Sequence, residues 1–197
     1  MSSAWQKPWS LDEFLAWEER QEARYEFDGF GPVAMTGGTE AHEGIGTRLR
    51  TILDNALSGT PCRVRGPTMK ILADGHIRYP DAFVTCGKTH RDSTVAAEPV
   101  VVFEVLSRST SHTDRILKLR EYGATPSIRR YVILEQNAIA ATVLTRVADA
   151  WNTTVLTEDD MLAMPEIGVT LTLSDVYADI DMPPDDAPRG DGSDEGG

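Results

Sequence analysis

The residue whose type conflicts most with its surroundings is Glu104. It lies inside the apolar run 99–106, which is typical of a strand buried on both faces of a sheet. An ionised carboxylate in such a strand is strongly destabilising unless it is paired, protonated or bound to a metal. Because a polar residue that breaks a consistent local pattern often has a function, Glu104 is the first candidate site residue.

A second carboxylate, Asp81, follows Pro80 at the start of another apolar run. If the two strands are neighbours, Asp81 and Glu104 converge on one side of a sheet. Carboxylate oxygens with open positions left over suit Mg²⁺ or Mn²⁺, which usually keep several waters. The backbone carbonyl of Val105 could add a further oxygen. The expected metal ligands are therefore Asp81, Glu104 and Val105.

Two more charged residues could complete a catalytic set. Lys118 lies four residues after Asp114 on a predicted helix, so the two share a helix face. An ammonium beside a metal-bound water could hold or deprotonate that water and stabilise negative charge in a transition state. Glu26 precedes the turn signal Asp28-Gly29 and could supply a third carboxylate.

Simpler interpretations remain open for each of these residues. Asp81 alone could cap a turn or a strand. Glu104 could form a buried ion pair with Arg78 or Lys118 without any metal. Lys118 and Glu26 could be ordinary surface residues of a helix and a hairpin. His42, in the first turn of a predicted helix, could assist the site or make a structural hydrogen bond.

The elements that must position these side chains follow from periodicity and capping signals. A capping box at Ser10 predicts a helix over 11–21, and Thr39 predicts the start of a long helix that ends near Leu57. Further expected elements are a hairpin over 25–36, strands at 62–65, 69–72, 77–86, 99–106, 130–134, 140–145 and 151–156, and a short helix at 173–177. This order predicts an α/β (α+β) fold with a mixed central sheet flanked by helices.

The helix that carries Lys118 is expected to begin near His112 or Thr113. Its apolar residues Ile116, Leu117, Leu119 and Tyr122 are predicted to pack one face.

Length and composition favour one soluble domain with a tail. The 197 residues suit a single domain over 1–182, and the acidic, Pro/Gly-rich segment 183–197 is predicted to be disordered. No apolar run is long enough to span a bilayer and no signal-peptide pattern is present, so we expect a cytoplasmic protein without membrane contact. In a reducing compartment, Cys62 and Cys86 are expected to be small buried hydrophobic residues.

A net charge of −12 argues against a general nucleic-acid-binding surface, because such binding depends on Lys and Arg contacts to phosphate. Any nucleic-acid contact must be local or carried by a bound cation. Six basic residues could make local phosphate contacts: Arg63, Arg65, Lys70, Arg78, Arg108 and Arg115.

Several of these segments together resemble a known family. They are residues 24–29, 35–39 with His42, 78–81, 101–107, and Asp114, Arg115, Lys118 and Tyr122. In this order and spacing they look like the Uma-two family, restriction-endonuclease-like proteins of the PD-(D/E)xK nuclease superfamily. The resemblance covers about residues 8–180.

The resemblance implies a restriction-endonuclease-like core, with Asp81 and Glu104 as metal-binding acids and Glu26 as an additional acid. It implies a Mg²⁺- or Mn²⁺-dependent endonuclease acting on nucleic acid, with DNA expected. The superfamily's lysine usually stands two residues after the second acid, where this chain has Leu106. The resemblance therefore points to Lys118 on the next helix.

Two further expectations concern activity and assembly. A catalytically silent module that binds nucleic acid or protein and keeps the nuclease fold is the alternative, and the acidic surface favours it. A homodimer is compatible with the nuclease hypothesis, because cutting both strands of a duplex requires two sites.

Overall fold

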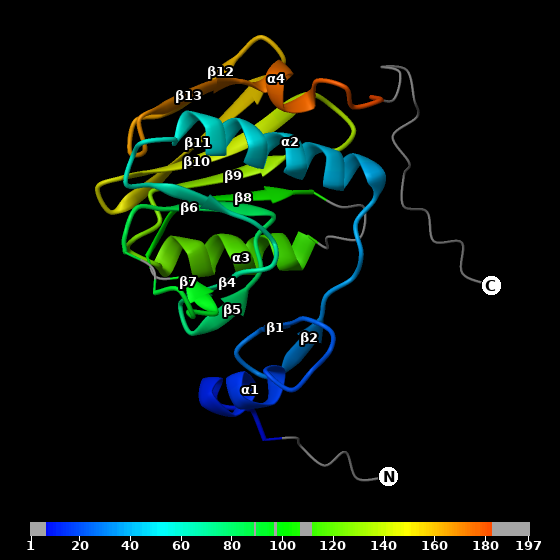
Figure 1. Cartoon of the computed structure of the whole chain (residues 1–197), viewed down its shortest axis with the longest axis vertical. Coiled ribbons are helices and arrows are strands. Elements are labelled where there is room, and N and C mark those ends of the chain that lie inside the picture. The colour runs from blue at the N-terminus through cyan, green and yellow to red at the C-terminus, as the bar shows by residue number, and fades with distance from the viewer. Residues whose placement is uncertain (1–6, 89, 97, 107–111, 183–197) are drawn as a thin grey trace, which may run out of the picture.

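The computed structural model describes residues 7–88, 90–96, 98–106 and 112–182 (Figure 1). Its helices are α1 (Leu11–Glu18), α2 (Glu40–Ala56), α3 (His112–Ala124) and α4 (Leu173–Tyr177). Its strands are β1 (Tyr25–Phe27), β2 (Pro32–Ala34), β3 (Arg63–Arg65), β4 (Lys70–Ala73), β5 (His76–Arg78), β6 (Ala82–Thr85), β7 (Val95–Ala96), β8 (Pro99–Val105), β9 (Arg130–Leu134), β10 (Ala140–Val147), β11 (Ala150–Thr157), β12 (Met161–Met164) and β13 (Val169–Thr172). The predicted tail 183–197 lies outside the described residues.

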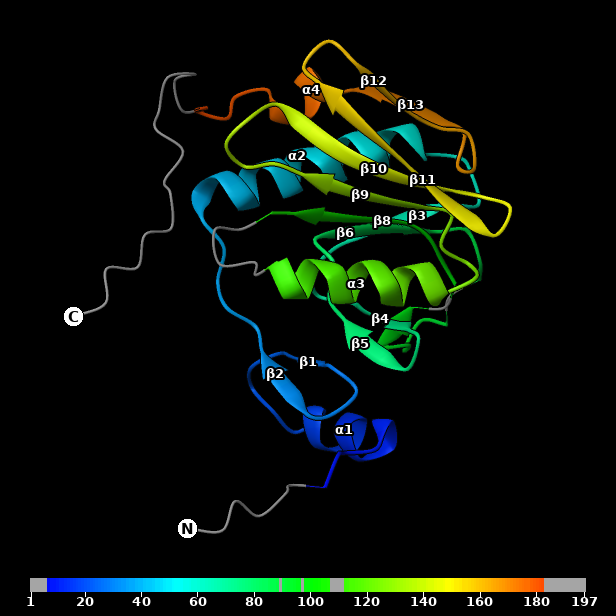
Figure 2. The same cartoon turned by 180° about the vertical axis from the view of Figure 1, so that it is seen from behind.

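The strands form two large sheets and a separate hairpin. A six-stranded sheet has the order β11-β10-β9-β8-β6-β3, and a five-stranded sheet has the order β2-β1-β5-β4-β7. In the six-stranded sheet β8 and β9 are parallel, whereas β6 and β8 are antiparallel. Helix α2 covers one face of this sheet, and α3 lies between its other face and β4 and β5 (Figures 1 and 2). This arrangement confirms the predicted mixed sheet flanked by helices.

Strand β8 is buried on both faces, as its run of apolar residues predicts. Phe103 and Val105 belong to the apolar core on the α2 side. Val102 belongs to the core that contains Tyr122 of α3. Because side chains alternate along a strand, Glu104 faces α3 with Val102.

The single strand predicted over 77–86 is wrong, and the strand that precedes it is joined to its first part by a tight turn. Asp74 and Gly75 have φ of 47° and 81° and join β4 to β5. The chain then leaves the five-stranded sheet after β5 and enters the six-stranded sheet at β6. The break coincides with Pro80, which has no N–H to donate to a ladder.

The predicted packing of α3 through its aliphatic residues is also wrong. Ile116, Leu117 and Leu119 are 50%, 42% and 40% exposed, and only Tyr122 of the predicted set is buried. The inward face carries charged side chains instead.

The cysteines are not two free thiols, so that expectation is wrong as well. Cys62 and Cys86 form a disulfide. Arg63 pairs with Thr85 in the antiparallel register of β3 and β6, so Cys62 and Cys86 are the next opposed pair. Sequence spacing alone could not show this pairing.

Among the described residues, no helix combines the length and apolarity needed to cross a bilayer.

The disulfide gives a first prediction. Replacing Cys62 and Cys86 together by Ser should lower the free energy of unfolding by about 3 kcal/mol, because the bond closes a loop between residues 24 positions apart. Urea denaturation of the double variant, compared with the oxidised and the reduced wild type, measures this difference. Two iodoacetamide-reactive thiols in denatured, unreduced wild-type protein would contradict the disulfide.

Candidate functional site

Glu104 is the penultimate residue of β8, and its side chain faces α3. It is 9% exposed, and β8 is flanked by β6 on one side and β9 on the other. The carboxylate is therefore held in the interior of the molecule by the strand that carries it. An acid in this position requires compensation from neighbouring groups.

Asp81 lies in the junction between β5 and β6, directly beside Glu104. The antiparallel register pairs Ala82 with Phe103, so one further step sets Asp81 opposite Glu104. Opposed residues of an antiparallel pair project from the same face. Asp81 Oδ2 also accepts a hydrogen bond from the Val105 N–H at 2.7 Å. The structure thus brings the two predicted acids together.

The backbone of Val105 is directed toward Asp81 by the alternation of the strand. The N–H of Leu106 donates to the carbonyl of Leu134 in β9 at 2.8 Å. The preceding residue therefore turns its N–H and carbonyl to the opposite side, toward β6. The Val105 carbonyl lies on the side of the strand where its predicted role as a ligand requires it.

His42, in the first turn of α2, reaches the same acid. Its Nε2 lies 3.3 Å from Asp81 Oδ2. The hydrogen bond to Asp81 raises the pKa of His42 above its usual value, and burial opposes this shift. Thr39 caps α2 by accepting the His42 N–H at 3.2 Å, which fixes the start of the helix. His42 therefore contacts a site residue.

A side-chain bridge ties the start of α2 to the end of β8. The Thr39 hydroxyl donates to Gln136 Oε1 at 2.6 Å, and Gln136 Nε2 donates to the Leu106 carbonyl. Gln136 is buried in the turn between β9 and β10. This bridge joins the segments that carry His42 and Glu104.

Helix α3 supplies two partners to Glu104. Lys118 Nζ lies 3.3 Å from Glu104 Oε1, and the Tyr122 hydroxyl donates to the same oxygen at 2.8 Å. Lys118 and Tyr122 are four residues apart, so both project from one face of α3. The predicted approach of Lys118 to the acid pair is found in the structure.

The protonation of Glu104 reflects this crowded environment. Burial raises the pKa of Glu104 to about 7, and the negative charges of Asp81 and Glu26 act in the same direction. Lys118 is the largest opposing influence, and the Tyr122 hydroxyl also favours the ionised form.

Glu26, on β1, enters the site through a chain of alternating charges. Its Oε1 accepts the Tyr79 N–H at 3.2 Å and lies 3.9 Å from Lys118 Nζ. Its Oε2 accepts from Arg78 at 2.9 Å. Arg78, 2% exposed, also donates twice to Glu121 of α3, at 2.7 and 2.6 Å. Glu26 thus lies between two cations, Arg78 and Lys118. The partners of Arg78 are Glu26 and Glu121, and the alternative pair with Glu104 is not formed.

These contacts explain the orientation of α3. Arg115, Lys118, Glu121 and Tyr122 are spaced three or four residues apart and form its inward stripe. Lys118 and Glu121 on this stripe pair with acids and an arginine of the two sheets, and the aliphatic residues of the helix therefore lie outward. To predict from the sequence which face of α3 turns inward, one must know that the strand opposite contains a carboxylate.

Sequence reasoning missed the roles of Glu121 and Tyr122. Glu121 was not singled out, and Tyr122 was expected as a core residue and as part of the family resemblance, without a contact to Glu104. Their spacing from Lys118 is the signal that could have identified them.

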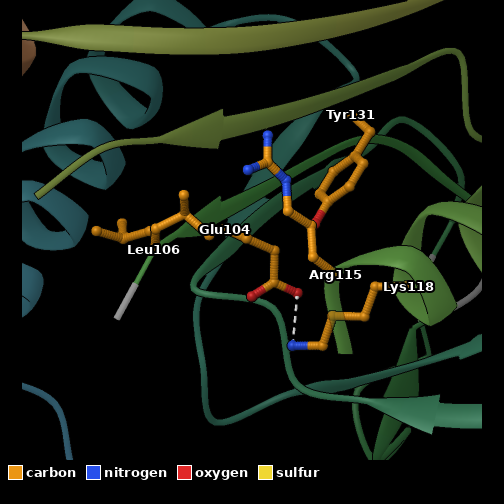
Figure 3. A pocket seen from close by; sticks show the side chains of 6 residues that line it. Glu104, Leu106, Arg115, Lys118 and Tyr131 are labelled. Atoms are coloured by element: carbon orange, nitrogen blue, oxygen red, sulfur yellow. Dashed lines mark ion pairs between the residues drawn. The ribbon is translucent and has the colours of Figure 1, made fainter. Parts of the chain in front are cut away.

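A small pocket opens beside Glu104. It is lined by Glu104, Val105, Leu106, Arg115, Lys118 and Tyr131. Figure 3 shows the Lys118 ammonium directed at the Glu104 carboxylate, with the Arg115 guanidinium turned away from that ammonium. Of the predicted site residues, Glu104, Val105 and Lys118 line this pocket, while Asp81 and Glu26 contact the lining residues.

Three comparisons relate the chain to known proteins. The family model Uma2, described as "Putative restriction endonuclease", matches residues 11–174. An uncharacterized protein of Synechocystis sp. is 32% identical over 172 residues, which cover 85% of this chain and 90% of that protein. A crystal structure from Anabaena variabilis, described as "a putative nuclease belonging to DUF820", matches with a TM-score of 0.73 at 16% identity, covering 86% of this chain and 98% of that one. At this identity the structural match shows the shared fold.

The raised pKa of Glu104 predicts a pH-dependent stability. A carboxyl whose folded pKa lies above its unfolded pKa contributes stability below the unfolded value and loses it as the pH rises through the folded value. The free energy of unfolding of wild type minus that of Glu104→Gln should therefore fall between pH 4.5 and about 7. Urea denaturation across this range measures it, with the exposed Glu158→Gln as control. A difference that is constant with pH would contradict the shift.

The buried pairs of Arg78 predict a large stability effect. Arg78→Met leaves Glu26 and Glu121 without their shared cation, and breaking a buried pair in this way typically costs about 3–5 kcal/mol. Chemical denaturation should show this loss, whereas the exposed Arg120→Ala on α3 should change stability by less than about 0.5 kcal/mol. Similar, small losses for both variants would show that the network does not stabilise the fold.

Proposed function

Because the chain belongs to the Uma2 family, we propose that it is a metal-dependent endonuclease that hydrolyses phosphodiester bonds of nucleic acid, with DNA as the substrate. The observation that carries this proposal is the convergence of Asp81, Glu104 and Lys118 at the end of one strand. The Val105 N–H at 2.7 Å holds Asp81 beside Glu104, and Lys118 reaches Glu104 from α3 at 3.3 Å. Two acids and a lysine in this arrangement suit phosphodiester hydrolysis.

The donor set fits a hydrated Mg²⁺ or Mn²⁺ ion. Within the described residues, no three His, Cys, Asp or Glu side chains form a group that could hold a metal. The contacts from His42, the Val105 N–H, Lys118 and Tyr122 fall on Asp81 Oδ2 and Glu104 Oε1. Magnesium is usually bound through one or two carboxylates and keeps several waters. Asp81, Glu104 and the Val105 carbonyl would hold it, in contrast to the closed ligand shell of structural zinc.

When bound, such an ion polarises the scissile phosphate and makes a bound water more acidic. Lys118 places a fixed positive charge at the pocket, where negative charge develops on the phosphate oxygens. Glu26, already engaged by Arg78 and the Tyr79 N–H, holds the Lys118 ammonium in place. His42 and the Val105 N–H fix the orientation of Asp81.

A catalytically silent binding module is the second candidate. The ion pair between Lys118 and Glu104 favours it, because this pair satisfies the buried carboxylate without a metal. Metal binding separates the two candidates. A homodimer belongs to the nuclease proposal, since it would provide one site for each strand of a duplex.

The proposal predicts cleavage that depends on the metal and on the site residues. Purified protein with Mn²⁺ should cleave DNA, and Glu104→Ala and Lys118→Ala should each lower the rate by about 10²-fold or more. Single- and double-stranded DNA and RNA of matched sequence define the substrate, and Glu158→Gln should cleave like wild type. Equal, low cleavage by wild type and both site variants would indicate a contaminating nuclease and reject the proposal.

Calorimetric titration with Mn²⁺ provides a readout that does not require activity. Wild type should bind the ion and Asp81→Ala should bind it more weakly, because one of the two carboxylates is lost. Binding of nucleic acid without any Mn²⁺ binding or cleavage would favour the silent module instead.

A further inference from the structure

The structure separates the six basic residues that could contact phosphate according to whether their charges are already engaged. Lys70 and Arg78 are 4% and 2% exposed. Lys70 pairs with Glu18, and Arg78 pairs with Glu26 and Glu121. Moving either cation toward a ligand would leave buried carboxylates unpaired, which is strongly unfavourable. Neither residue is available to a nucleic acid.

The two arginines of β3 are engaged by the backbone. Arg63 donates to the carbonyls of Thr60 and Cys62, and Arg65 donates to the carbonyl of Val64. Strand β3 is the edge of the six-stranded sheet and is joined to β8 only through β6. Neither arginine lines the pocket beside Glu104. Arg108 lies outside the described residues.

Arg115 differs from Arg63, Arg65, Lys70 and Arg78 both in its position at the pocket and in the engagement of its charge. It lines the pocket together with Glu104 and Lys118, and it is half-buried in the first turn of α3. It makes no hydrogen bond or ion pair within the part of the chain that the structure describes. Figure 3 shows its guanidinium on the side of the pocket opposite the Lys118 ammonium. The pocket therefore contains a guanidinium that is not engaged by the residues that the structure describes.

The charge balance of the pocket indicates the ligand. Two cations and one carboxylate line it, in a protein whose net charge is −12. A polyanion is repelled by the molecule as a whole, and this lining offers it two cations. Lys118 is held by Glu104 and Glu26, so Arg115 is the cation whose donors are open to a bound anion. A guanidinium binds a phosphate through two parallel N–H donors, which also orients the phosphate.

We propose that Arg115 binds a phosphodiester group of the nucleic-acid substrate beside the one that is cleaved, and so positions the chain in the pocket. This inference rests on the proposed nuclease function. Arg115 acts on binding, and the acids and Lys118 act on the reacting phosphate. The same contact serves DNA and RNA, because the phosphodiester is common to both.

The test measures binding in the absence of cleavage. A fluorescein-labelled 12-nucleotide DNA strand and the RNA of the same sequence are titrated with protein in Ca²⁺ at several salt concentrations. Arg115→Ala should weaken binding by about tenfold and lower the slope of log affinity against log salt by about 0.7. Arg115→Lys should keep the slope and recover only part of the affinity, because it retains the charge without the paired donors. Inorganic phosphate at matched ionic strength should compete with wild type and not with Arg115→Ala.

Arg120→Ala is the matched control, since Arg120 is an exposed arginine of the same helix. It should bind both strands like wild type. If Arg115→Ala binds like wild type, or if Arg120→Ala loses as much affinity, Arg115 is not the phosphate contact, and the nuclease proposal stands without it. If the wild type binds neither strand, the proposed function fails and this inference fails with it.

Discussion

The charge on Glu104 is the constraint on which the surrounding structure depends. Its strand is buried on both faces, so the carboxylate must find its compensation inside the protein. Lys118 provides it, Glu26 balances Lys118, Arg78 balances Glu26, and Glu121 balances Arg78. Each residue in this series is therefore paired with at least one residue of opposite charge. The series runs through β8, α3, β1 and β5, and therefore fixes how these four elements approach one another.

Helix α3 shows how this constraint reverses the usual amphipathic pattern. A helix that covers a sheet normally buries its aliphatic stripe. Here Lys118 and Glu121 occupy the inward face because they pair with the buried Glu104 and the buried Arg78, and residues such as Ile116 and Leu119 are exposed. The helix is positioned by directional ionic contacts in addition to apolar packing, which suits an element that must place an ammonium within a few ångströms of a carboxylate.

Much of the site could be predicted because its main signal is local. Glu104 interrupts an apolar strand, and this interruption is visible in the sequence itself. Lys118 stands on a different element, so its position in the sequence makes it a candidate, and the family resemblance adds the reason to expect the lysine on this helix. The contacts of Arg78 with Glu26 and Glu121 join residues 52 and 43 positions apart, and no local pattern encodes such pairs. The disulfide between Cys62 and Cys86 was missed for the same reason.

The division of the chain between β5 and β6 was also beyond local prediction, because Pro80 is compatible with a strand start as well as with a break. Strand lengths and the mixed architecture follow from periodicity, which depends on neighbours within a few residues. The partition of strands between two sheets depends on long-range pairing. Asp81 was therefore placed correctly at a strand start, while its position between the sheets became visible only in the fold.

This position has a consequence for how the molecule tolerates change. Glu26 and Arg78 belong to the five-stranded sheet, whereas Glu104 belongs to the six-stranded one. Backbone hydrogen bonds hold each half of the site within its own sheet, whereas the distance between the halves depends on the short connection from β5 to β6, on side-chain packing and on the ion pairs. Ile71 of β4 belongs, with Val102 of β8, to the apolar cluster between the two sheets. Substitutions in that cluster would change the distance between the two halves of the site while every site residue stays the same. Functional divergence among relatives can therefore arise from the packing between the sheets.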